Sequence, residues 1–131
     1  MGTHAFIAKL NKDLSVNAIY VHYDGQISKT GQILYDCYYK ESQVDRLIES
    51  GSLVTLKENI DDIEFYSDIK GVSKEIYHFN SMSDLEKHLH HYPNIEYVYM
   101  YNAAVHNDWL VSEFNEIDHM IDWQFLNLEL P

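Results

Sequence analysis

Two apolar segments near the N-terminus, separated by a short polar turn, limit the possible folds more than any other part of the sequence. Residues 3–10 are mostly apolar, and residues 15–23 place apolar side chains at both odd and even positions. The turn between them, Asn11-Lys12-Asp13, consists of residue types that are common in hairpin loops. Because a strand that is apolar on both faces is covered on both faces, these residues predict a hairpin in the interior of a sheet.

Helix signals occur in three later segments. Thr30 is a candidate N-cap for the first helix, and Ser42 with Asp45 resembles a capping box for the second. Gly51 is suited to end the second helix, and the third has to end before Pro93. The predicted helices cover residues 31–40, 42–50 and 81–92.

Short apolar runs in the second half of the chain predict further strands, with an irregular stretch over residues 52–60. The predicted strands cover residues 63–69, 75–79, 95–101 and 109–114, the last two as a second hairpin. The tail, residues 117–130, is predicted to form a short helix followed by a strand. Together these elements predict one α+β domain over residues 1–131, in which an antiparallel sheet built from the N-terminal and C-terminal hairpins packs with two or three short helices.

The composition excludes several classes of protein. Hydrophobic residues make up 46% of the 131 residues, which excludes a disordered chain and allows a sizeable core. The single cysteine, Cys37, lies in an apolar run and predicts a buried thiol, no internal disulfide and a reducing compartment. No apolar run approaches the roughly 18 residues of a membrane span, and no signal-peptide pattern is present. We therefore expect a soluble cytoplasmic protein.

The charge is strongly acidic and unevenly distributed. Twenty-one acidic residues against nine basic ones give a net charge of −12, and Lys87 is the last basic residue. Binding of nucleic acid needs a basic face that neutralises phosphates, and anionic membranes attract basic segments, so neither partner is expected. A protein with a positive surface would instead be attracted.

The acidic residues form two clusters in the sequence, and they have two interpretations. One is a solvated surface that keeps the protein soluble. The other is a rigid array of carboxylates that imitates the spaced phosphates of duplex DNA and occupies the basic channel of a nucleic-acid-binding protein. The residues expected to contact such a partner are Glu58, Asp61, Asp62, Glu64, Glu113, Glu116, Asp118 and Asp122.

Residues 20–25 contain the most distinctive polar motif. His22 and Asp24 lie two positions apart and would share a strand face, which is a possible acid–base pair. No nucleophile motif accompanies them, and an Asp that organises the turn after a strand explains the same residues. A third interpretation is a tyrosine-lined ligand pocket formed by Tyr20, His22, Tyr23 and Asp24.

Motifs for metals, cofactors and phosphates are weak. Of the eight histidines, His88, His90 and His91 cluster at the end of a predicted helix, with His78 upstream, but their spacing matches no common zinc motif. Imidazolium groups also interact favourably with a helix C-terminus, which is the simpler explanation. The five glycines are too dispersed for a phosphate-binding loop. We predict no metal site, no cofactor and no enzymatic activity.

Three segments carry a resemblance to a known family. Met1-Gly2-Thr3, the strand that ends in residues 19–25, and residues 44–53 are similar to small bacteriophage and prophage proteins that begin Met-Gly-Thr-Arg and contain a His-Trp-Asp-Gly-type motif. This chain departs from the pattern at His4 and Tyr23, where Arg and Trp are usual, and around residues 26–30. The resemblance implies a phage origin, and small phage proteins without enzymatic motifs frequently counter host defence.

The leading hypothesis is therefore a non-enzymatic phage-type inhibitor that binds the basic, nucleic-acid-binding surface of a host defence protein, of the anti-restriction or anti-CRISPR type. It would act in the host cytoplasm, without binding nucleic acid or a membrane itself. The alternative is a small-molecule or nucleotide-signal binding protein with a tyrosine-lined pocket. Phosphates, however, need Lys, Arg or helix N-termini, which are scarce in this chain.

Overall fold

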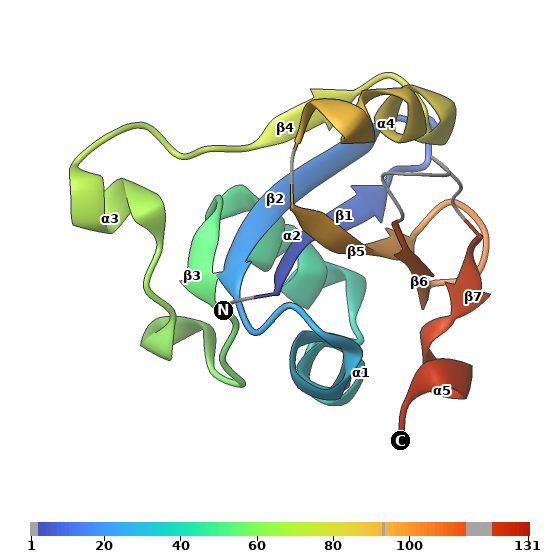
Figure 1. The fold of residues 1–131 in the computed structure, drawn as a ribbon, viewed down its shortest axis with the longest axis horizontal. Helices are drawn as coiled ribbons and strands as arrows, with labels where there is room; N and C mark the ends of the chain where they lie inside the picture. Colours follow the sequence, from blue (N-terminus) through green and yellow to red (C-terminus); the bar gives the residue numbers. More distant parts are fainter. Residues whose placement is uncertain (1–2, 93, 115–121) are drawn as a thin grey trace.

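The computed structural model describes residues 3–92, 94–114 and 122–131, and within these ranges the chain has an α+β fold (Figure 1). Seven strands form one sheet, in the order β3-β2-β1-β5-β6-β7, with β4 pairing with β2 outside this path. The strands are β1 (His4–Leu10), β2 (Val16–Tyr23), β3 (Leu53–Thr55), β4 (Tyr77–Phe79), β5 (Ile95–Asn102), β6 (Asp108–Glu113) and β7 (Gln124–Phe125).

Both predicted hairpins are confirmed, but the sheet that they build is mixed rather than antiparallel. β1 pairs antiparallel with β2, with Ile7 opposite Ile19, and β5 pairs antiparallel with β6. The two hairpins join through β1 and β5, which run parallel with Ile7 opposite Tyr99, and β2 and β3 are parallel as well. A parallel pair needs a long crossover, and residues 24–94 supply one between the hairpins. The prediction of an antiparallel sheet was therefore wrong at these two pairings.

The five helices of the described ranges are short. They are α1 (Gln32–Cys37), α2 (Glu41–Glu49), α3 (Tyr66–Lys70), α4 (Met82–His88) and α5 (Leu126–Glu129). The first predicted helix ends at Cys37 instead of residue 40, and Thr30 does not cap it, because a π turn (Ile27–Gly31) precedes α1. The Thr30 hydroxyl donates instead to the carbonyl of Asp24, 2.7 Å away.

Two other predicted caps are confirmed. Gly51 follows α2 with a φ of 90°, a left-handed conformation that glycine adopts without strain. Ser81 begins α4, where its side chain accepts a hydrogen bond from the amide of Asp84 at 3.0 Å.

The segment between α2 and α4 differs most from prediction. Residues 52–60, expected to be irregular, contain the short strand β3. Residues 63–69, expected to be a strand, form instead a bend into α3, which ends at Gly71 with a φ of 64°. In the tail, the predicted helix over residues 117–121 lies outside the described residues, and the strand predicted after it is limited to β7, because residues 126–129 form α5.

Helices cover both faces of the sheet and create two cores. On one face, Ile7 and Ile19 pack with α1 and α2, whose Leu34 and Leu47 are fully buried. On the other face, Phe6 packs with residues of α4 and the turn that follows it. Adjacent residues of β1 thus enter opposite cores, as expected for an interior strand. Among the described helices, none is long and apolar enough to cross a membrane.

Candidate functional site

The first group of predicted contact residues is exposed at the β3 edge of the sheet, between β3 and α3. It is not free of cations, because Arg46 forms an ion pair with Asp61 at 3.3 Å. Lys29 and Lys57 also line a hollow of about 460 Å³ with the acidic residues of this edge. The group, which we call the β3-edge acids, consists of Glu58, Asp61, Asp62 and Glu64.

The second group lies at the opposite edge of the sheet. Glu113 ends β6, and Asp122 precedes β7, whereas Glu116 and Asp118 lie outside the described residues. Glu113, Asp122 and Glu129 of α5 together line a hollow of about 260 Å³. We call it the acidic hollow, and its lining is completed by Ile27, Val111 and Gln124. Glu129 was not among the contact residues predicted from the sequence.

No positive charge offsets the acidic hollow within its described lining. All three carboxylates are exposed, and the whole sequence contains no Lys or Arg after Lys87. The negative charge acts on a neighbouring phenol: burial raises the pKa of Tyr97, and the charges of Glu113 and Glu96 raise it further. The described lining of the acidic hollow thus has three carboxylates and no Lys or Arg.

The two acidic groups lie toward opposite ends of the strand order. They flank β3 and β7, which are separated by five strand spacings, or roughly 24 Å. Each group therefore requires a separate test.

The predicted tyrosine pocket is not formed as one site. Tyr20 and His22 lie on the face of the sheet opposite α1 and α2, where the Tyr20 hydroxyl is 3.2 Å from Nδ1 of His22. Their rings continue into those of His4 and Tyr66, and the Tyr23 ring packs edge-on against His22 at 4.3 Å. These rings contact one another in one aromatic cluster.

Asp24 departs from this cluster, because β2 ends at Tyr23 and Asp24 turns the chain with a φ of 58°. It lines the hollow at the β3 edge with Lys29 and Lys57. Burial lowers the pKa of His22, and the charges of His4 and Lys70 lower it further. The left-handed turn at Asp24 interrupts the strand alternation by which His22 and Asp24 were expected to share a face.

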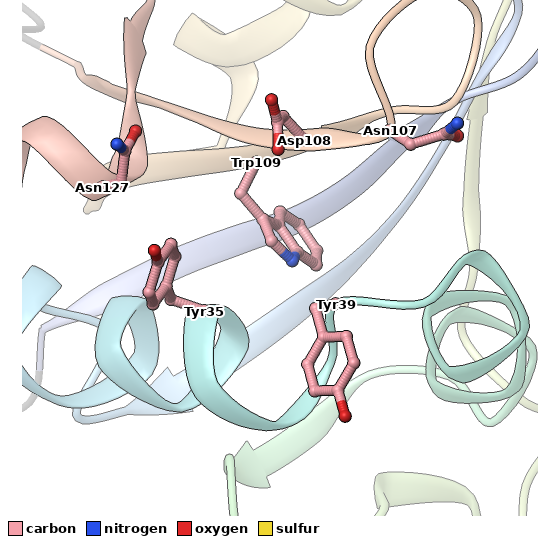
Figure 2. A pocket seen from close by; sticks show the side chains of 6 residues that line it. All are labelled: Tyr35, Tyr39, Asn107, Asp108, Trp109 and Asn127. Carbon is pink, nitrogen blue, oxygen red and sulfur yellow. The ribbon is translucent and has the colours of Figure 1, made fainter.

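A hollow of about 390 Å³ that the sequence did not predict lies between α1, the start of β6 and α5. Figure 2 shows Tyr35 and Tyr39 on the α1 side, Asp108 and Asn127 on the other, and the Trp109 ring between them. We call it the Tyr–Trp hollow, and its lining residues are Tyr35, Tyr39, Asn107, Asp108, Trp109 and Asn127.

The sequence contained one signal for this site. Tyr35 and Tyr39 are four residues apart in the predicted helix 31–40, which would place them on one face, but α1 ends at Cys37 and leaves Tyr39 outside the helix. The opposing residues come from distant segments that only the tertiary fold brings together.

The histidines of the described chain serve local structure. His88 lies 2.8 Å from the carbonyl of Asp84 and 3.1 Å from its carboxylate, and His78 lies 2.7 Å from the side chain of Asn17. Within the described residues, no group of three or more His, Cys, Asp or Glu side chains is placed to hold a metal ion.

Comparison of the chain with protein-family models, with curated proteins and with solved structures gave no match. Function therefore has to be inferred from the side chains of this chain.

Proposed function

We propose that this chain is a non-enzymatic binding protein that contacts a basic protein surface through the acidic hollow. One observation carries the proposal: Glu113 of β6, Asp122 before β7 and Glu129 of α5 line one concave site without a cation in its described lining. Exposed carboxylates repel each other unless a cation is near, and a partner's Lys or Arg would remove that repulsion. The hollow is thus better suited to a cationic partner than to an anionic one.

The biological role that we propose for this contact is inhibition of a host defence protein by a phage-type protein in the host cytoplasm. The carboxylates would stand in for the phosphates of DNA on a restriction or CRISPR enzyme and so compete with the nucleic acid. The net charge of −12 and the resemblance of the N-terminal segments to phage proteins support this role.

The β3-edge acids have a secondary part in the proposal. Arg46 already pairs with Asp61, and Lys29 and Lys57 lie nearby, so the field that a partner meets at this edge is weaker. Charge reversal at the two edges should therefore have unequal effects.

The test compares two triple variants with the same change in charge. Glu113→Lys/Asp122→Lys/Glu129→Lys reverses the acidic hollow, and Asp61→Lys/Asp62→Lys/Glu64→Lys reverses the β3 edge. Each is expressed in bacterial strains that carry one restriction or CRISPR system, and the efficiency of plating of a susceptible phage is measured. Wild type should raise plating in at least one strain, the hollow variant should abolish the effect, and the β3-edge variant should weaken it.

Two outcomes would count against the proposal. If wild type changes plating in none of the strains, the anti-defence role fails. If both variants lose inhibition equally while remaining folded by circular dichroism, net charge rather than the acidic hollow is responsible.

A further inference from the structure

We infer that the Tyr–Trp hollow is a binding site for an uncharged sugar ring. The site is independent of the proposed partner surface, because it has a different lining and holds one carboxylate where the acidic hollow holds three.

One exposed aromatic ring borders the site, because Figure 2 shows Tyr35 turned toward Trp109, whereas the ring of Tyr39 points away from the other labelled side chains. Tyr35 is 46% exposed and Tyr39 is 55% exposed, whereas Tyr99 and Tyr101 of the neighbouring sheet are at most 1% exposed. Exposed rings that border a cavity offer flat apolar faces, and the C–H face of a pyranose can pack against such a face.

The floor of the site is held rigidly. The Trp109 indole N–H donates to the carbonyl of Tyr38 at 2.8 Å, and its ring packs edge-on against Tyr101 at 5.3 Å. The Tyr101 hydroxyl donates in turn to the carbonyl of Tyr39 at 3.2 Å. These contacts fix the backbone of residues 38 and 39 to the floor, so a ligand would meet a preorganised surface and lose less free energy to ordering it.

Polar side chains without partners lie around the rim of the hollow. Within the described part of the chain, no hydrogen bond or ion pair engages the side chains of Asp108, Asn107 or Asn127. A carboxylate accepts hydrogen bonds from two hydroxyl groups, and an amide both donates and accepts. This mixture matches the vicinal hydroxyl groups of a sugar.

Charge decides against a phosphorylated ligand. The described lining contains Asp108 but no Lys or Arg, and the Lys40 ammonium lies over the outward-pointing Tyr39 ring, 6.0 Å from its centre. Burial raises the pKa of Tyr101 beneath the site, the charges of Glu41 and Asp108 raise it further, and the charge of Lys9 lowers it. A phosphate would find no cationic partner within this lining, whereas a neutral hydroxylated ring needs none.

The volume of about 390 Å³ falls in the range of small-ligand sites and suits a mono- or disaccharide. A flat, open site of this kind makes few contacts, so we expect weak binding.

The experiment follows the two tryptophan indole N–H signals by NMR during titration with methyl glucoside, N-acetylglucosamine and maltose. Trp109 lies in the hollow and Trp123 does not, so a sugar should shift the Trp109 signal and leave that of Trp123 unchanged. Tyr35→Ala should weaken binding at least tenfold. Tyr23→Ala is the matched control, because Tyr23 is also 46% exposed but packs on His22 instead, and it should bind as wild type does.

Three results would overturn the inference. The first is the absence of any Trp109 shift with all three sugars, and the second is an equal loss of binding in Tyr23→Ala. The third is tighter binding of adenosine or AMP than of any sugar, which would assign the hollow to a nucleobase. None of these results bears on the acidic hollow, so the two proposals fail separately.

Discussion

The Tyr–Trp hollow and the acidic hollow are built by the same neighbouring elements and yet have opposite chemistry. β6 and α5 contribute to both, with Trp109 and Asn127 in one and Glu113 and Glu129 in the other. Trp109, Val111 and Glu113 lie on the same face of β6, so three residues of one strand face change the lining from an indole to a carboxylate. The net charge of a chain therefore does not tell where on the surface the charge acts.

The largest effect is expected when the buried residue that supports both hollows is removed. Leu126 of α5 is fully buried in the core beneath α1, and its Cδ1 would lie 3.2 Å from a Cβ on Gly31. Leu126→Ala should lower the free energy of unfolding by about 2–5 kcal/mol and release α5, so that partner and sugar binding weaken together. Urea unfolding and both binding assays measure this.

Leu128→Ala is the control for that change, because Leu128 lies two residues away but is 71% exposed. It should alter the unfolding free energy by less than about 0.5 kcal/mol. A loss of only one binding activity in Leu126→Ala would show that the two hollows do not depend on the same anchor.

A smaller effect is expected for the pH dependence of stability, which depends on a contact between α2 and β1. The Lys9 ammonium donates to Glu41 at 2.9 Å and also pairs with Asp45, which ties α2 to β1. The hydrogen bond from Lys9, and then its charge, lower the pKa of the Glu41 carboxyl below its usual 4.5. A lowered folded pKa contributes stability that is present above the unfolded pKa and is lost as the pH falls through the folded value.

Unfolding by urea between about pH 6 and pH 3 should therefore show a stability advantage of wild type over Glu41→Gln that disappears at the acidic end. Glu49→Gln, at an exposed position of the same helix, should follow wild type throughout. An advantage that does not change with pH would contradict the role of the Lys9 contact.

Much of the scaffold could be predicted from local pattern. Both hairpins follow from apolar periodicity, and α2 and α4 follow from their boundary residues, Gly51 and Ser81. Periodicity gives the face on which a side chain lies but not the direction of the neighbouring strand, so the parallel pairing of β1 with β5 could not be predicted. In residues 63–69, alternating apolar residues predicted a strand, but Phe65 only bridges Leu53 before α3 begins.

The sites were less predictable because they depend on distant segments. The sequence identified Glu113 and Asp122, but not that Glu129 joins them, since α5 returns to β6 only through the burial of Leu126. The expectation that His22 and Asp24 share a strand face was wrong for a local reason, because β2 ends at Tyr23, one residue before Asp24.

The most direct test of the proposed partner surface compares Glu129 and Asn127, which both belong to α5 but line different hollows. Against a defence enzyme that wild type inhibits, the inhibitory concentration of Glu129→Lys and Asn127→Ala is measured at low and high salt. We predict at least a tenfold loss of inhibition for Glu129→Lys, about 1.4 kcal/mol, that shrinks as salt screens the charge, and no change for Asn127→Ala. Equal inhibition by the two variants would contradict the claim that the acidic hollow is the partner surface.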